Sequence, residues 1–251
     1  MYSCKNVIKN IKRSEYQKFL NNYGKGHTDE TVRKVNGCLG PCLREAVYDG
    51  YIKKDSTFNI MTKGTVKCKE EQFKYISIKH YLALMEFLKS RNEPSYIFLY
   101  LLSITGARYS DAINITYEDL NKASGIIHLP GTKTKNSKRD VEVSNKDIMI
   151  IKSKLSKLPI RYNGKLFSLS HTAVNKAFKH AKAEISLDDD NITPYSLRHT
   201  HTSYLLSKGL PIEYISKRLG HSSISITLDT YSHLLDEHKK EQGQRVRELF
   251  S

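Results

Sequence analysis

The chain has 251 residues, of which 39% are hydrophobic, and its 41 lysines and arginines outnumber 26 acidic residues to give a net charge of +15. This apolar content is enough to bury a core in one large domain or two ordinary ones, which excludes a disordered tail protein. No apolar run approaches the roughly 20 residues that span a bilayer and no signal peptide follows Met1, so the positive charge predicts a cytoplasmic protein that binds nucleic acid rather than an anionic membrane.

Residues 1–62 are predicted to form a small helical domain. Thr28 or Asp29 is placed to cap a helix, Gly40-Pro41 is expected to kink or split it, and Asp49-Gly50 to end it. Apolar residues recur along it at three- and four-residue steps, at Val32, Val35, Leu39, Leu43 and Val47. Residues 1–71 hold 14 lysines and arginines against 8 acids, a net charge of +6. This charge suits a grip on DNA, although a basic solvated surface explains it almost equally well.

The four cysteines lack the paired spacing of a zinc site, and we expect free thiols. Cys38 and Cys42 are four residues apart, so on a continuous helix they share a face that could in principle ligate a metal. No matching histidine pair follows, and burial between helices is the favoured interpretation. We therefore expect neither a metal nor another cofactor.

Residues 63–74 are predicted to be an exposed linker, because they show no periodicity and carry lysines, a glycine and two adjacent glutamates. A second domain is expected over residues 75–251. A helical pattern begins at Ser77 and breaks at Asn92-Glu93-Pro94, and another helix follows towards Gly106. The apolar positions of these two helices include Ile78, Tyr81, Leu82, Leu84, Met85, Leu88, Phe98, Leu101 and Leu102.

Residues 125–144 change period and predict a β-hairpin. Ile126, Ile127 and Leu129 form a short apolar run, and Val141 and Val143 alternate with polar residues. The turn between them is polar and basic, from residue 133 to residue 139, with residues 136–137 as the expected reversal. From residue 145 the pattern is helical again almost to the end of the chain.

Three separated segments combine a tight turn with cationic or hydroxyl side chains. In the first, Gly106 allows a turn, Arg108 follows near a helix start, and Asp111 can reach back to orient its guanidinium. The second, residues 193–200, is a proline-initiated helix that displays Arg198. The third contains His221 after a glycine and Tyr231 ten residues later. Each segment alone also fits an ordinary surface ion pair or amphipathic helix.

Together the segments resemble the tyrosine recombinase (phage integrase) family. In that family one arginine follows a T-G-x-R turn, a second lies in an H-x-x-R-H-T box, a histidine follows L-G, and a nucleophilic tyrosine comes about ten residues later. The matching positions here are Arg108, Arg198, His221 and Tyr231, and the resemblance covers residues 77–235 well. The family implies a mainly helical catalytic domain with a small antiparallel sheet. It also implies an N-terminal domain that binds core sites, so that the two domains close around duplex DNA as a clamp.

The resemblance implies roles for these residues. Arg108 and Arg198 match phosphate oxygens bidentately, His221 adds a donor and a possible proton relay, and Tyr231 attacks to form a 3′-phosphotyrosine. A lysine on the β-turn would protonate the departing 5′ oxygen, and Lys133 fits best, with Lys135 and Lys138 as substitutes. Rejoining then needs neither ATP nor metal. The implied partners are double-stranded core recombination sites and, on DNA, a homo-tetramer of a chain that is monomeric when free.

One residue departs from the family pattern. The H-x-x-R box begins here with Tyr195, which can donate a hydrogen bond to a phosphate but cannot carry positive charge at neutral pH. An acid–base role at this position is therefore in doubt, and we expect slower chemistry or altered geometry rather than loss of function.

The resemblance favours a site-specific recombinase that integrates or excises a mobile element or prophage. A type IB topoisomerase-like nicking and closing enzyme and a catalytically dead DNA-binding relic are the alternatives. Residues 1–60 leave no room for an additional arm-binding domain, so either the protein lacks one or the chain is a fragment. The tail from Leu234 to Ser251 is expected to dock on a neighbouring protomer, or else to fold back on its own domain.

Overall fold

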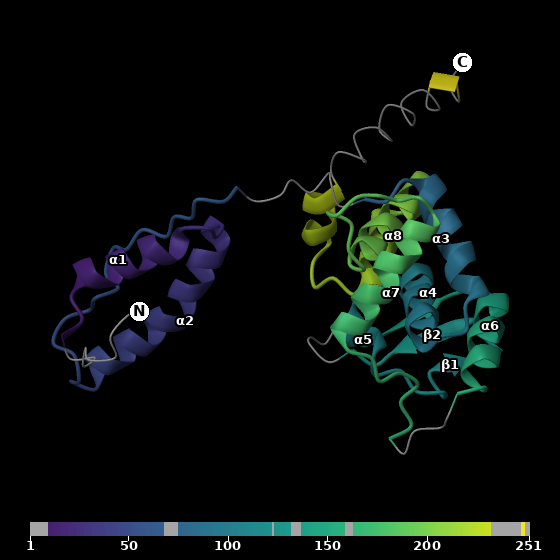
Figure 1. Cartoon of the computed structure of the whole chain (residues 1–251), viewed down its shortest axis with the longest axis horizontal. Coiled ribbons are helices and arrows are strands. Elements are labelled where there is room, and N and C mark those ends of the chain that lie inside the picture. Colours follow the sequence, from purple (N-terminus) through teal and green to yellow (C-terminus); the bar gives the residue numbers. More distant parts are fainter. Residues whose placement is uncertain are drawn as a thin grey trace. The chain divides into compact units, whose positions relative to one another are not determined.

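The computed structural model describes residues 10–67, 75–121, 123–131, 137–158, 163–231 and 247–248. The chain divides into two compact units, residues 1–70 and 71–251 (Figure 1). Across the described residues, no helix is long and apolar enough to cross a membrane.

The first unit contains two helices, α1 (Arg13–Gly24) and α2 (Asp29–Tyr48). Thr28 caps α2 by accepting a hydrogen bond from the Thr31 amide, which fixes one of the two predicted caps. Pro41 lies inside α2 without ending it, so the expected splitting of this helix is wrong.

The core of the first unit is small and leaves much of α2 uncovered. Tyr16, Leu20 and Val32 form its buried apolar cluster, and Ile52 is also buried. Cys38 and Cys42 are free thiols, as expected, but both are exposed. Their predicted burial is therefore wrong, because α1 covers only one face of the long helix.

The second unit is mainly helical and is built around one apolar helix. Its labelled helices are α3 (Ile78–Ser90), α4 (Pro94–Thr105), α5 (Tyr109–Ala112), α6 (Asn145–Leu155), α7 (His171–Glu184), α8 (Ser196–Ser207) and α9 (Ile212–Leu219), and residues 224–231 are also helical. Every residue of α4 from Ile97 to Thr105 is buried, as expected of a helix that is apolar all round. Helices α3, α5, α6, α7 and α8 all contact α4, and Figure 1 shows it in the middle of the unit.

A three-stranded antiparallel sheet completes the second unit. It consists of β1 (Leu120–Asn121), β2 (Ile126–Leu129) and β3 (Arg139–Glu142), in the order β1-β2-β3. Ile127 pairs with Val141 and Leu129 with Arg139, so the predicted hairpin strands are confirmed. Residues 133–136 of the predicted turn lie outside the described residues. A mainly helical fold with a small antiparallel sheet is the fold class that the sequence predicted.

Candidate active site

Arg198 joins the three predicted segments. From α8, its Nη1 donates to the carbonyl oxygen of Gly106 at 2.8 Å, and its Nη2 donates to the carbonyl oxygen of Leu219 at 2.9 Å. Nη2 also lies 2.8 Å from Nε2 of His221. The side chain is 3% exposed. One guanidinium therefore holds together turns that lie 92 and 21 residues away along the chain.

Two left-handed glycines shape the turns that Arg198 binds. Gly106 ends α4 with φ 64°, and Gly220 ends α9 with φ 68°. This conformation costs glycine little and other residues more. At Gly106 a side chain is also excluded by space, because an added Cβ would lie 2.6 Å from Cδ2 of His201.

His221 is a neutral ring with a defined proton position. Arg198 can only donate, so Nε2 of His221 must accept, and the ring proton lies on Nδ1. Nδ1 is 2.6 Å from Oγ1 of Thr227, which accepts that proton's hydrogen bond. Burial, followed by the charges of Arg198 and Arg108, lowers the pKa of His221 to about 3. At neutral pH this residue is a hydrogen-bonding group without charge.

Arg108 immediately precedes α5 and is the more accessible arginine, with 29% of its side chain exposed. The predicted partner Asp111 is fully buried on α5, and its Oδ2 lies 3.8 Å from Nη1 of Arg108. The same Oδ2 is closer, at 3.1 Å, to Nη1 of Arg139. Asp111 is therefore shared by two arginines, and the second is its nearer partner.

Arg139 is a site residue that the sequence did not single out. At the start of β3, its Nε donates to the carbonyl oxygen of Arg218 at 2.6 Å and its Nη1 to that of Ser137 at 2.8 Å. Its charge helps to lower the pKa of both His221 and Arg198, after burial and other groups. The alternation of the strand could have revealed it. Val141 faces the interior, and Arg139, two residues earlier, lies on the same face of the strand.

Tyr231, the predicted nucleophile, is buried, with 2% of its surface exposed. Its ring packs in a cluster with Leu206, Ile215 and Leu219. Burial raises the pKa of its phenol above the usual range, and the nearby Thr202 hydroxyl and the charge of Arg198 oppose that rise. The phenol oxygen lies 3.0 Å from Nδ1 of His199. In this state Tyr231 is a neutral phenol that solvent does not reach.

Tyr195 and Lys133 are the remaining two candidates. Tyr195 immediately precedes α8 and is 52% exposed, with its ring edge-on to His199 at 5.0 Å. Lys133 lies outside the described residues. The structure thus brings together Arg108, Arg198 and His221, places Tyr231 beside the same helix, and leaves Tyr195 at its start.

The site can stabilise an anion and supply a nucleophile. Two guanidiniums on separate elements offer planar sets of donors to phosphate oxygens. Within the described parts of the chain, no cluster of histidine, cysteine and acidic side chains could hold a metal ion. The chemistry available from the described side chains is that of a tyrosine hydroxyl beside fixed cations.

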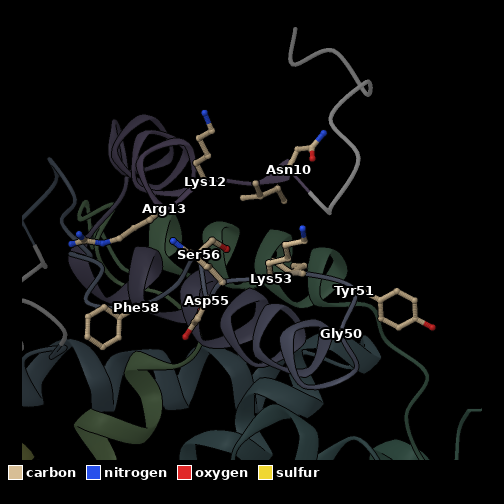
Figure 2. Close-up of a pocket in the computed structure, with 12 residues that line it drawn as sticks. Asn10, Lys12, Arg13, Gly50, Tyr51, Lys53, Asp55, Ser56 and Phe58 are labelled. Atoms are coloured by element: carbon tan, nitrogen blue, oxygen red, sulfur yellow. The ribbon is translucent and has the colours of Figure 1, made fainter.

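The first unit carries a basic hollow of its own, with a volume of about 920 Å³ (Figure 2). It lies between the start of α1 and the segment that follows α2, and its cationic lining residues are Lys12, Arg13, Lys53 and Lys54. Asp55 is the acidic residue among its lining. Such a surface suits phosphates rather than a cation.

Comparisons with known proteins fit both the motifs and the fold. Residues 74–238 match the phage integrase family. The whole chain is 26% identical over 293 residues to a tyrosine recombinase XerC-like protein of Caldanaerobacter subterraneus, covering 74% of that protein. The chain is also 23% identical over 274 residues to the ICEBs1 integrase of Bacillus subtilis. This alignment covers 99% of the chain and 74% of that integrase.

Solved structures share the fold. The Tn1549 transposon integrase, in complex with transposon right end DNA, matches with a TM-score of 0.71 and 16% identity, over 96% of this chain and 87% of that one. XerH recombinase, bound to a palindromic difH substrate, matches with a TM-score of 0.69 and 18% identity, over 96% and 73% of the two chains.

Proposed function

The chain belongs to the phage integrase family of tyrosine recombinases, and from this we propose that Tyr231 cleaves and rejoins DNA through a 3′-phosphotyrosine. The protein is a site-specific recombinase of the kind that integrates or excises mobile DNA. The observation that carries the residue assignment is the guanidinium of Arg198, which binds Gly106, Leu219 and His221 together.

The fixed cations act where negative charge grows. A phosphodiester is anionic, and its non-bridging oxygens gain charge as the tyrosine attacks. Arg108 is partly exposed and is proposed to contact the DNA phosphate first. Arg198 is buried, and its hydrogen bonds to the carbonyl oxygens of Gly106 and Leu219 hold its guanidinium in a fixed position. When the phosphate replaces His221 as a hydrogen-bond partner of Arg198, the neutral His221 ring can hydrogen-bond to the phosphate or to the reacting groups. Tyr195, which is exposed at the start of α8, is proposed to donate a hydrogen bond to the phosphate.

The nucleophile must be uncovered before it reacts. With 2% of Tyr231 exposed, a phosphate cannot reach its oxygen in the described state. DNA binding is therefore proposed to free the phenol oxygen. Lys133 is proposed to protonate the departing 5′ oxygen, on the strength of the family resemblance.

The first unit is proposed to bind the core sites. Its basic hollow and its net positive charge suit the DNA backbone. We further propose that residues 1–62 and 75–251 are two domains joined by a linker. The two domains would close as a clamp around duplex DNA. Four such chains would assemble on DNA in the cytoplasm and exchange strands.

Covalent capture tests the nucleophile. Duplexes that bind the protein would be selected from a random pool, nicked so that cleavage becomes irreversible, and assayed for an adduct that survives denaturant. Tyr231→Phe should abolish the adduct while duplex binding stays nearly intact, because one hydroxyl and little charge is removed. Tyr117→Phe is the matched control, since Tyr117 is exposed. An adduct with Tyr231→Phe would refute the assignment.

Truncation tests the proposed tetramer. A chain ended after Asp236 should bind a single half-site normally and fail in assembly and strand exchange, because the tail directly follows Tyr231. Gel shift and recombination assays at matched protein concentration measure the two properties. Normal recombination by the truncated chain would rule out a coupling role for the tail.

A further inference from the structure

His199 is a buried histidine that faces the nucleophile. It follows Arg198 on α8, is 8% exposed, and its Nδ1 lies 3.0 Å from the phenol oxygen of Tyr231. The rings of Tyr195 and Tyr75 both pack edge-on against the His199 ring, with ring centroids 5.0 Å and 5.9 Å away. His199 occupies the second histidine position of the H-x-x-R-H-T box, and the mechanism above gives it no role.

The proton of Tyr231 needs a destination during cleavage. Burial raises the pKa of the phenol, so the hydroxyl keeps its proton at neutral pH. When the oxygen attacks phosphorus, that proton must leave, and an acceptor within hydrogen-bonding distance assists its departure.

The other groups of the site are poor acceptors. His221 accepts from Arg198 at Nε2, donates to Thr227 from Nδ1, and has a pKa lowered to about 3. Tyr195 is a phenol where the family has a histidine. The hydroxyl of Thr202 already donates to the carbonyl oxygen of Arg198 at 2.9 Å, and an alcohol is a weak base.

We propose that Nδ1 of His199 accepts the phenolic proton of Tyr231 during cleavage and returns it during rejoining. The inference rests on Tyr231 being the nucleophile. The bond from the phenol oxygen to phosphorus forms while the bond from phosphorus to the 5′ oxygen breaks. The 5′ oxygen keeps the electron pair and takes a proton from the separate acid proposed above, and His199 becomes an imidazolium. His199 thus supplies the base that Tyr195 cannot supply.

A bound phosphate would favour the proton transfer to His199. The guanidinium of Arg198 lies on the same helix, next to His199 in the sequence. The aromatic rings of Tyr75, Tyr195 and Tyr231 pack against His199. A bound phosphodiester adds the negative charge that favours an imidazolium beside it.

The test compares His199→Asn with wild type on the nicked duplex used for covalent capture. Asparagine keeps a polar atom near the position of Nδ1 but cannot take up a proton. Adduct formation at pH 7 should be about 100-fold slower. The variant's rate should then rise with pH to pH 9 as hydroxide replaces the base, while the wild-type rate levels off. His180→Asn, on exposed α7 surface, should match wild type.

Other outcomes would overturn the proposal. If His199 only holds Tyr231 in its buried position, His199→Asn would cleave as fast as wild type or faster. A loss that stays constant from pH 6 to pH 9 would indicate a structural role. If Tyr231→Phe still forms the adduct, the proposed function itself fails; if only His199→Asn is normal, this inference alone fails.

A measurement on the wild-type chain guards against misfolding of the variant. Nitrogen-15 spectra of histidine rings report which ring nitrogen carries the proton. Nδ1 of His199 should be unprotonated at pH 7.5 and should shift in Tyr231→Phe, which removes its hydrogen-bond donor. A proton on Nδ1 in the wild-type protein would overturn the proposal.

Discussion

The ion pair of Asp111 and Arg139 is predicted to be a main stabilising element of the second unit. Asp111 is fully buried, the Arg139 side chain is 7% exposed, and their atoms are 3.1 Å apart. Asp111→Asn leaves the charge of Arg139 buried without a counter-ion. Breaking a buried pair in this way costs roughly 3–5 kcal/mol. The lower end applies here, because the asparagine oxygen still accepts one hydrogen bond, so we expect a loss of about 3 kcal/mol.

Thermal unfolding followed by circular dichroism measures this loss. For a unit of this size, about 3 kcal/mol corresponds to a fall in Tm of about 6–12 °C. The control is Asp140→Asn, whose exposed pair with His128 should matter little. Adding Arg139→Gln to Asp111→Asn should restore part of the stability, because it removes the stranded charge. A Tm for Asp111→Asn within about 2 °C of wild type would refute the reasoning.

Three further outcomes are expected. Arg198→Lys should slow adduct formation about 100-fold with little change in duplex affinity, because one ammonium cannot span the contacts of two guanidinium nitrogens; equal rates would contradict the bidentate argument. Adduct formation should persist in excess EDTA without ATP, whereas a strict requirement for a divalent ion would indicate a nuclease. Burial and the charge of Arg218 lower the pKa of His201 to about 3, so the unfolded chain binds an extra proton and stability falls as pH drops from about 6.5 towards 3. In urea titrations, His201→Gln should reduce that slope by up to about 1.4 kcal/mol per pH unit; an unchanged slope would mean that His201 is protonated in the folded protein.

The sequence alone located the hairpin strands and the residues of the three motifs. These features depend on local geometry: Gly106 and Gly220 occupy left-handed caps that glycine favours, and alternation places Val141 inside. Motif order and spacing then placed Arg108, Arg198, His221 and Tyr231. Local patterns did not decide the exposure of Cys38, because that depends on which helix covers α2.

Only the tertiary structure decided which side chains meet. Asp111 pairs more closely with Arg139, 28 residues away, than with Arg108, and Tyr231 meets His199 across 32 residues. Periodicity predicts which face of an element is buried, but not which buried faces pack together. Those contacts follow from the packing of α8 against α4 and α9, and of α9 against β3, because a buried charge or hydroxyl is stable only where packing brings it a partner.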